Sequence, residues 1–171
     1  MTFDLVAVAE HISRKINILN GGSWADVGRY FEEDTQWATD LLSRVSLLVG
    51  DSQIEYSSGQ VEHGEEDNTY TGEIVVFTTS SIVLANFSLK PGDAHWKLVL
   101  DLKVSSSRRD SVISVTALGV RTSNDGKLTR PSVNVELANG KVLALPTGKR
   151  PLFPDDPDLV DFASKILVPP R

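Results

Sequence analysis

The sequence predicts an α+β fold with two N-terminal helices, then a seven-stranded antiparallel barrel or strongly bent sheet, closed by one C-terminal helix. Three observations lead to this prediction. Apolar residues recur every three or four positions before Gly50 and every second position after Asp51, which are the periods of a helix and of a strand. Asn139-Gly140 lies between two alternating runs and indicates a hairpin. Residues 157–167 form an apolar-faced stretch that starts with helix-capping residues.

Residues 1–50 are expected to form a helical extension. The first helix, residues 2–19, ends at Asn20-Gly21-Gly22, which tolerate the left-handed backbone found at many helix ends. The second begins with Ser23 as its cap, and its apolar period continues to Gly50. We interpret its apolar face as docked on the first helix or on the sheet. The alternative is a surface for self-association or for a protein partner, made of Trp24, Val27, Phe31, Trp37 and Leu41.

Residues 51–171 form the second predicted unit, the antiparallel barrel with its capping helix. Runs 70–77 and 82–89 are rich in β-branched and aromatic residues, and a four-residue turn of Thr and Ser separates them. Residues 112–120 are apolar on both faces, which is typical of a central strand. We expect polar loops at residues 59–68 and 105–110.

The C-terminal helix has clear start and stop signals. Asp156 is suited to the N-cap, Pro157 fits the first helical position, and Pro169-Pro170 ends the helix. Its apolar side chains recur at helical spacing, so this face must be buried against another part of the chain. These side chains are Leu159, Phe162, Ala163, Ile166 and Leu167.

Two hairpins and the final helix have a wording that is shared with a known family. They are Val75-Val76-Phe77-Thr78-Thr79-Ser80-Ser81-Ile82-Val83-Leu84, then Val133 to Leu137 with Ala138-Asn139-Gly140-Lys141-Val142, and then Leu159-Val160-Asp161-Phe162-Ala163-Ser164-Lys165-Ile166-Leu167. On these residues, the layout of residues 52–168 resembles the bacterial members of the pleckstrin-homology-like (PH-like) superfamily, whose barrel is plugged by a final helix. This chain departs from that family in its two N-terminal helices, and it has Thr and Ser where bacterial hairpins of this type carry a basic residue. A helix-grip fold, in which a sheet wraps a longer C-terminal helix around an apolar cavity, is the competing layout.

Composition narrows the class of function. The net charge is −6, and residues 1–96 hold 5 Lys/Arg against 15 Asp/Glu, while residues 97–171 hold 12 against 8. A net acidic chain argues against nucleic-acid binding, which needs clustered cations. There is no Cys, so the chain has no disulfide, thiol nucleophile or Cys-based zinc site. No apolar run approaches a membrane span and no secretion signal is recognisable, so we expect a soluble cytoplasmic protein.

No catalytic or cofactor-binding motif occurs in the sequence. The three His residues lack the i, i+4 spacing of a helical zinc site, and there is neither a Gly-x-Ser-x-Gly motif nor a phosphate-binding Gly loop. We therefore predict no catalytic residue, no metal site and no cofactor, and we favour a protein that is not an enzyme.

Two basic pairs are the candidate ligand-binding residues, Arg108 and Arg109 between strands and Lys149 and Arg150 before the last helix. PH-like barrels that bind anionic head groups use basic loops at the open end, so the resemblance implies a site for lipid or phosphate there. Arg guanidinium groups bind phosphate oxygens as a fork. Four cations are few for membrane recruitment, so peripheral membrane contact is a secondary expectation.

Three functional hypotheses follow. The leading one is a non-catalytic PH-like interaction module that binds a protein partner or its own copy through the N-terminal helices. The second is a small-ligand carrier or enzyme with a helix-grip or cone-like cavity lined by Trp96, Tyr70 and Phe87. The third is a sensor of anionic lipid or phosphate that uses the two basic pairs.

Overall fold

The computed structural model describes residues 5–19, 36–64, 69–92, 98–122, 128–147 and 156–166. It contains α-helices, strands and one short 3-10 helix, η1. In chain order the described elements are α1 (Leu5–Leu19), α3 (Gln36–Val49), β1 (Ile54–Gly64), β2 (Thr69–Thr78), β3 (Ser81–Pro91), β4 (Leu98–Arg108), η1 (Arg109–Ser111), β5 (Val112–Thr122), β6 (Leu128–Leu137), β7 (Val142–Leu145) and α4 (Pro157–Lys165).

The fold is α+β as predicted, but the predicted barrel or single bent sheet is wrong. The strands form two separate open antiparallel sheets, one of four strands in the order β1-β2-β3-β4 and one of three in the order β5-β6-β7. The division falls at η1, where the backbone leaves the ladder with β3 and β5 then pairs forward with β6. Among the described strands, no pairing joins the two sheets.

The helix pattern also differs from the prediction. Of the helix expected from Ser23, the structure describes only the part from Gln36 on, which is α3. Residues 20–35 lie outside the described residues. η1 occurs between β4 and β5, where no helix was expected. No described helix is long and apolar enough to cross a membrane.

Two strands are longer than their polar sequences suggest. β1 continues to Gly64 and β4 continues to Arg108, although both ends were expected to be loops. Each extension is paired along its length, since His63 lies opposite Tyr70 and Arg108 opposite Ser81. Pairing with a neighbouring strand therefore overrides the weak β-propensity of Ser and Gly. The hairpins at Thr78–Ser81 and Asn139-Gly140 are confirmed.

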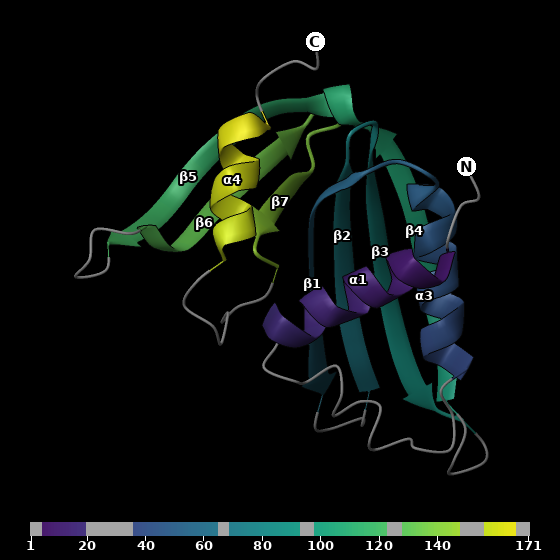
Figure 1. Cartoon of the computed structure of the whole chain (residues 1–171). Helices are drawn as coiled ribbons and strands as arrows, with labels where there is room; N and C mark the ends of the chain where they lie inside the picture. Colours follow the sequence, from purple (N-terminus) through teal and green to yellow (C-terminus); the bar gives the residue numbers. More distant parts are fainter. Residues whose placement is uncertain are drawn as a thin grey trace.

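The helices α1 and α3 cover one face of the four-stranded sheet (Figure 1). Trp37, Leu41, Val45 and Val49 recur every four residues along α3 and are buried against the sheet. Ile12 of α1 joins the same core cluster. From Gln36 on, these four positions of the second predicted helix are thus buried inside the subunit, whereas Leu48 is 39% exposed. Residues from both sides of position 50 share one core.

The opposite face of the four-stranded sheet packs on the three-stranded sheet and on α4. The sheets contribute buried side chains from both sides, and α4 adds the apolar face that its sequence predicts, without Leu167, which lies outside the described residues. The four-stranded sheet is therefore covered on both faces over the part of it nearest η1. The buried members of this second cluster are Tyr56, Val75, Phe77, Ile82, Leu84, Val133, Val135, Leu137, Leu143, Leu145, Leu159, Phe162 and Ile166.

Candidate functional site

The two neighbouring arginines at the start of η1 have different environments. The Arg108 side chain is 84% exposed, and its Nη2 lies 2.6 Å from the Asp110 carboxylate, which is also exposed. The Arg109 side chain is only 12% exposed. Arg108 is thus accessible to a ligand, whereas the Arg109 side chain is mostly buried and pairs with Glu55 of the same chain.

Arg109 contacts three separate parts of the structure. Its Nε donates to the Glu55 carboxylate on β1 at 3.1 Å, and its Nη1 donates to the Ile166 carbonyl oxygen, at the end of α4, at 3.4 Å. A cation is favourable there because carbonyl groups point out of a helix C-terminus. The guanidinium carbon also lies 5.7 Å from the ring centroid of Phe77 and 5.4 Å from that of Phe162, within the range of cation–π attraction.

A β-bulge at the start of β1 brings Glu55 to this position. The register between β1 and β2 shifts between Ile54 and Tyr56, so that Glu55 is an extra residue in the ladder. Ile54 packs against the cluster between α1, α3 and the four-stranded sheet, which we call the α1/α3 core. Tyr56 packs in the second cluster, which contains the apolar face of α4 and which we call the α4 core. The bulge therefore directs both Glu55 and Tyr56 towards α4.

Tyr56 and Asp156 form a buried polar contact at the other end of α4. The Tyr56 hydroxyl donates to Oδ2 of Asp156 at 2.9 Å, and Oδ1 of Asp156 accepts from the Leu159 backbone N–H at 3.3 Å, which confirms the predicted N-cap. Burial, and then the negative charge of Asp156, raise the pKa of Tyr56 far above its ordinary value. The phenol therefore stays protonated and acts as a hydrogen-bond donor.

A second buried polar contact ties β1 to the chain after β7. Ser58 Oγ lies 2.9 Å from Thr147 Oγ1 and accepts from the Thr147 backbone N–H at 2.9 Å. Both residues are buried. Together with Tyr56 and Glu55, Ser58 makes β1 the strand to which η1, α4 and the end of β7 are all attached.

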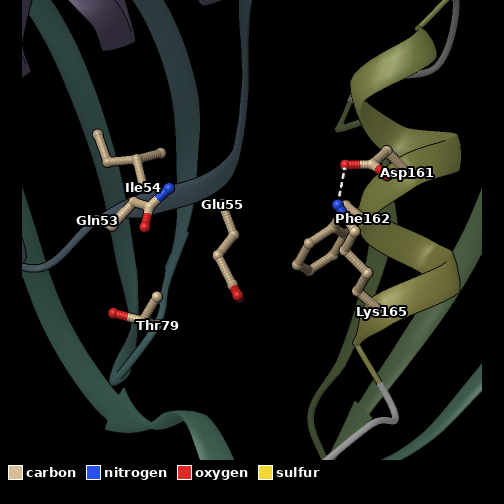
Figure 2. Close-up of a pocket in the computed structure, with 7 residues that line it drawn as sticks. All are labelled: Gln53, Ile54, Glu55, Thr79, Asp161, Phe162 and Lys165. Atoms are coloured by element: carbon tan, nitrogen blue, oxygen red, sulfur yellow. Dashed lines mark hydrogen bonds and ion pairs between the residues drawn. The ribbon is translucent and has the colours of Figure 1, made fainter. Parts of the chain in front are cut away.

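A small polar cavity of about 190 Å³ lies between the start of β1 and α4. Figure 2 shows Glu55 and Phe162 pointing into this space from opposite sides. Its carboxylates are already in ion pairs, Glu55 with Arg109 and Asp161 with Lys165 at 2.6 Å. The Phe162 ring also stacks with Tyr56 and contacts the Arg109 guanidinium. The full lining is Gln53, Ile54, Glu55, Thr79, Asp161, Phe162 and Lys165.

The other candidate residues are either in the core or outside the described residues. Trp37 and Leu41, from the predicted interaction surface, are 4% and 0% exposed. Tyr70 and Phe87, from the predicted cavity lining, are each 5% exposed and belong to the α1/α3 core. No group of three His, Cys, Asp or Glu in the described part of the chain is placed to hold a metal ion. The candidates outside the described residues are Trp24, Val27, Phe31, Trp96, Lys149 and Arg150.

Strand β5 carries exposed apolar side chains that the sequence interpretation missed. Its apolar composition indicated a central strand, but β5 is an edge strand of the three-stranded sheet. Ile113 and Leu118 are 57% and 58% exposed. Neither residue has a pairing partner on β6, because the register shifts at both positions. These bulges turn the two side chains out of the regular in–out alternation of the strand. No local signal distinguishes such an edge from a buried strand.

Comparison with family models, with curated proteins and with solved structures finds no match to this chain. The PH-like resemblance therefore stays a prediction.

Replacing Tyr56 by Phe should lower the free energy of unfolding by about 2 kcal/mol at neutral pH, because a buried charged acceptor loses its donor. The folded-state pKa of Tyr56 is raised, so its stabilising effect is complete below the ordinary Tyr pKa of 10.0 and is lost as pH rises above that value. Urea unfolding between about pH 8 and pH 11 should show the wild-type losing up to about 1.4 kcal/mol per pH unit more than Tyr56→Phe. A difference that does not change with pH would contradict this assignment.

Arg109→Ala should lower the free energy of unfolding by about 2 kcal/mol, since it leaves Glu55 and the end of α4 without their cation. Arg108→Ala is the matched control and should change stability by less than about 0.5 kcal/mol, because its ion pair is exposed. Arg109→Lys should recover only part of the loss, because Lys lacks the planar fork. Thermal or urea unfolding measures all three, and equal effects at the two arginines would refute the distinction.

Proposed function

We propose that this chain is a non-catalytic module that binds another protein through strand β5. The observation that carries the proposal is the exposure of Ile113 and Leu118 on an edge strand. Large apolar side chains that stay in water at a sheet edge favour association with a partner. Residues 112–120 of β5 include no charged side chain, so no charge opposes the approach of an apolar surface.

The other edge strands of the two sheets are better protected from association. β1 carries Glu55 and Glu62 and contacts α1. β4 carries Asp101 and Lys103 on its exposed face, and β7 has only four residues. Charges, cover by a helix and short length are the usual means by which proteins prevent edge pairing. Of the edges described, β5 is the long one without charge in its first nine positions.

The remaining hypotheses receive less support from the arrangement of side chains. A partner site on α3 built from Trp37 and Leu41 needs residues that fill the core. An anion site built from both Arg108 and Arg109 needs a guanidinium that already pairs with Glu55. The PH-like resemblance is compatible with a binding module, although a fold alone says little about function.

The double variant Ile113→Asp with Leu118→Asp should abolish partner binding and leave the fold intact, because both positions are more than half exposed. Val99→Asp is the control: Val99 is 55% exposed on β4, and it lies opposite Lys90, which suits an added carboxylate. The measurement is the amount of partner protein that each immobilised protein captures. Circular dichroism verifies that each variant is folded.

The wild-type and Val99→Asp should capture the partner protein in similar amounts. The β5 variant should capture at least about tenfold less of it. Light scattering on the purified chain tests the case in which the partner is a second copy, since the β5 variant should then convert a dimer to a monomer. Identical capture profiles and identical masses for all three proteins would refute the proposal.

A further inference from the structure

We infer that the β5 partner is an extended, uncharged segment that adds to the sheet as a new strand beside residues 114–117. This inference rests on the proposed function and specifies its ligand and its mode of binding. It depends on the backbone of β5, whereas the proposed function depends on the exposed side chains, so the two can be tested separately.

The backbone of β5 offers a short regular edge between two bulges. Ser114, Val115, Thr116 and Ala117 pair in unbroken register with Glu136, Asn134 and their neighbours on β6. In an antiparallel sheet, alternate residues direct their N–H and C=O groups to opposite edges of the strand. About two of these four residues therefore present both groups to the side away from β6. Such groups pair with any extended backbone that approaches them.

The two bulges define the length of segment that fits. Ile113 precedes the regular stretch and Leu118 follows it, and the register shifts next to both. Bulges twist an edge and end regular pairing, so a bound strand pairs along the stretch between them and not along all of β5. The segment is therefore short, about six residues from one apolar side chain to the other, at the rise of a strand. Ile113 and Leu118 then provide apolar contacts at its two ends.

The charges near β5 define the chemistry of the segment. The nearest carboxylate on the neighbouring strand, Glu136, accepts the Ser114 hydroxyl at 2.9 Å. It lies on β6, on the far side of β5 and about 10 Å from a strand added at the free edge, which is two strand spacings. Asp110 is paired with Arg108 beyond the start of the strand. A charged side chain carried by the segment would lose hydration beside residues 114–117 without gaining a counter-charge. The segment that fits is therefore apolar or β-branched and uncharged over its central residues.

The experiment uses a displayed library of random decapeptides, selected for binding to the whole chain. Selected peptides should be uncharged and rich in Val, Ile, Thr or aromatic residues in their centre. Their binding should weaken at least about tenfold with the variant Ile113→Asp and Leu118→Asp, and not with Val99→Asp. Hydrogen exchange of the wild-type should slow at residues 114–117 when peptide is bound.

N-methylation of the peptide separates strand addition from side-chain docking. Methyl groups on one set of alternate amides should weaken binding at least about tenfold, and methyl groups on the other set should leave it unchanged, because only one set faces β5. If both sets are tolerated, or if no peptide is selected, strand addition is refuted while the proposed function still stands. If selected peptides bind the β5 variant as well as the wild-type, β5 is not the site and the proposed function fails.

Discussion

The attachment of helix α4 to strand β1 is the constraint on which the rest of the structure depends. The two sheets share no described strand pairing, so side chains must hold them together. Leu159, Phe162 and Ile166 are buried between the sheets and each stabilises the assembly by about 1.5–3 kcal/mol. This apolar contribution to the free energy of folding is larger than that of the polar contacts. It does not determine the orientation of α4, because apolar contacts are non-directional. Asp156 with Tyr56 at one end, and Arg109 with Glu55 and Ile166 at the other, determine where α4 lies on β1.

This attachment also separates structural residues from those available for binding. The chemistry of Arg109, Tyr56 and Asp156 is typical of functional sites, yet each of these side chains is committed to holding α4. The same is true of four apolar side chains of α3, which are buried against the other face of the four-stranded sheet: Trp37, Leu41, Val45 and Val49. Among the described large apolar side chains that face solvent, Ile113 and Leu118 lie together on the uncharged part of the β5 edge. The proposed function therefore follows from which residues the core leaves unused.

Local chemistry explains what the sequence predicts correctly. The N-cap at Asp156, the Asn139-Gly140 hairpin and the apolar period from Trp37 to Val49 each depend on residues close together in the chain. The errors depend on distant pairing: β4 continues through Ser105 because β3 lies beside it, and the sheet divides because η1 turns the backbone. Arg108 and Arg109 are equivalent in the sequence, and only the positions of Glu55 and Phe162 distinguish them. The edge position of β5 has the same non-local origin.

Native-state hydrogen exchange of the wild-type chain is the most direct test of the α4 attachment. The amide of Ile166 donates to the Phe162 carbonyl oxygen in the last turn of α4, at 2.9 Å, and reports on the end held by Arg109. A helix of nine residues held only by apolar contacts should open at that end long before the sheet. Our account predicts an opening free energy for the Ile166 amide within about 1 kcal/mol of that for the buried amides of β2 and β3. A value several kcal/mol lower, with the sheet still protected, would contradict it.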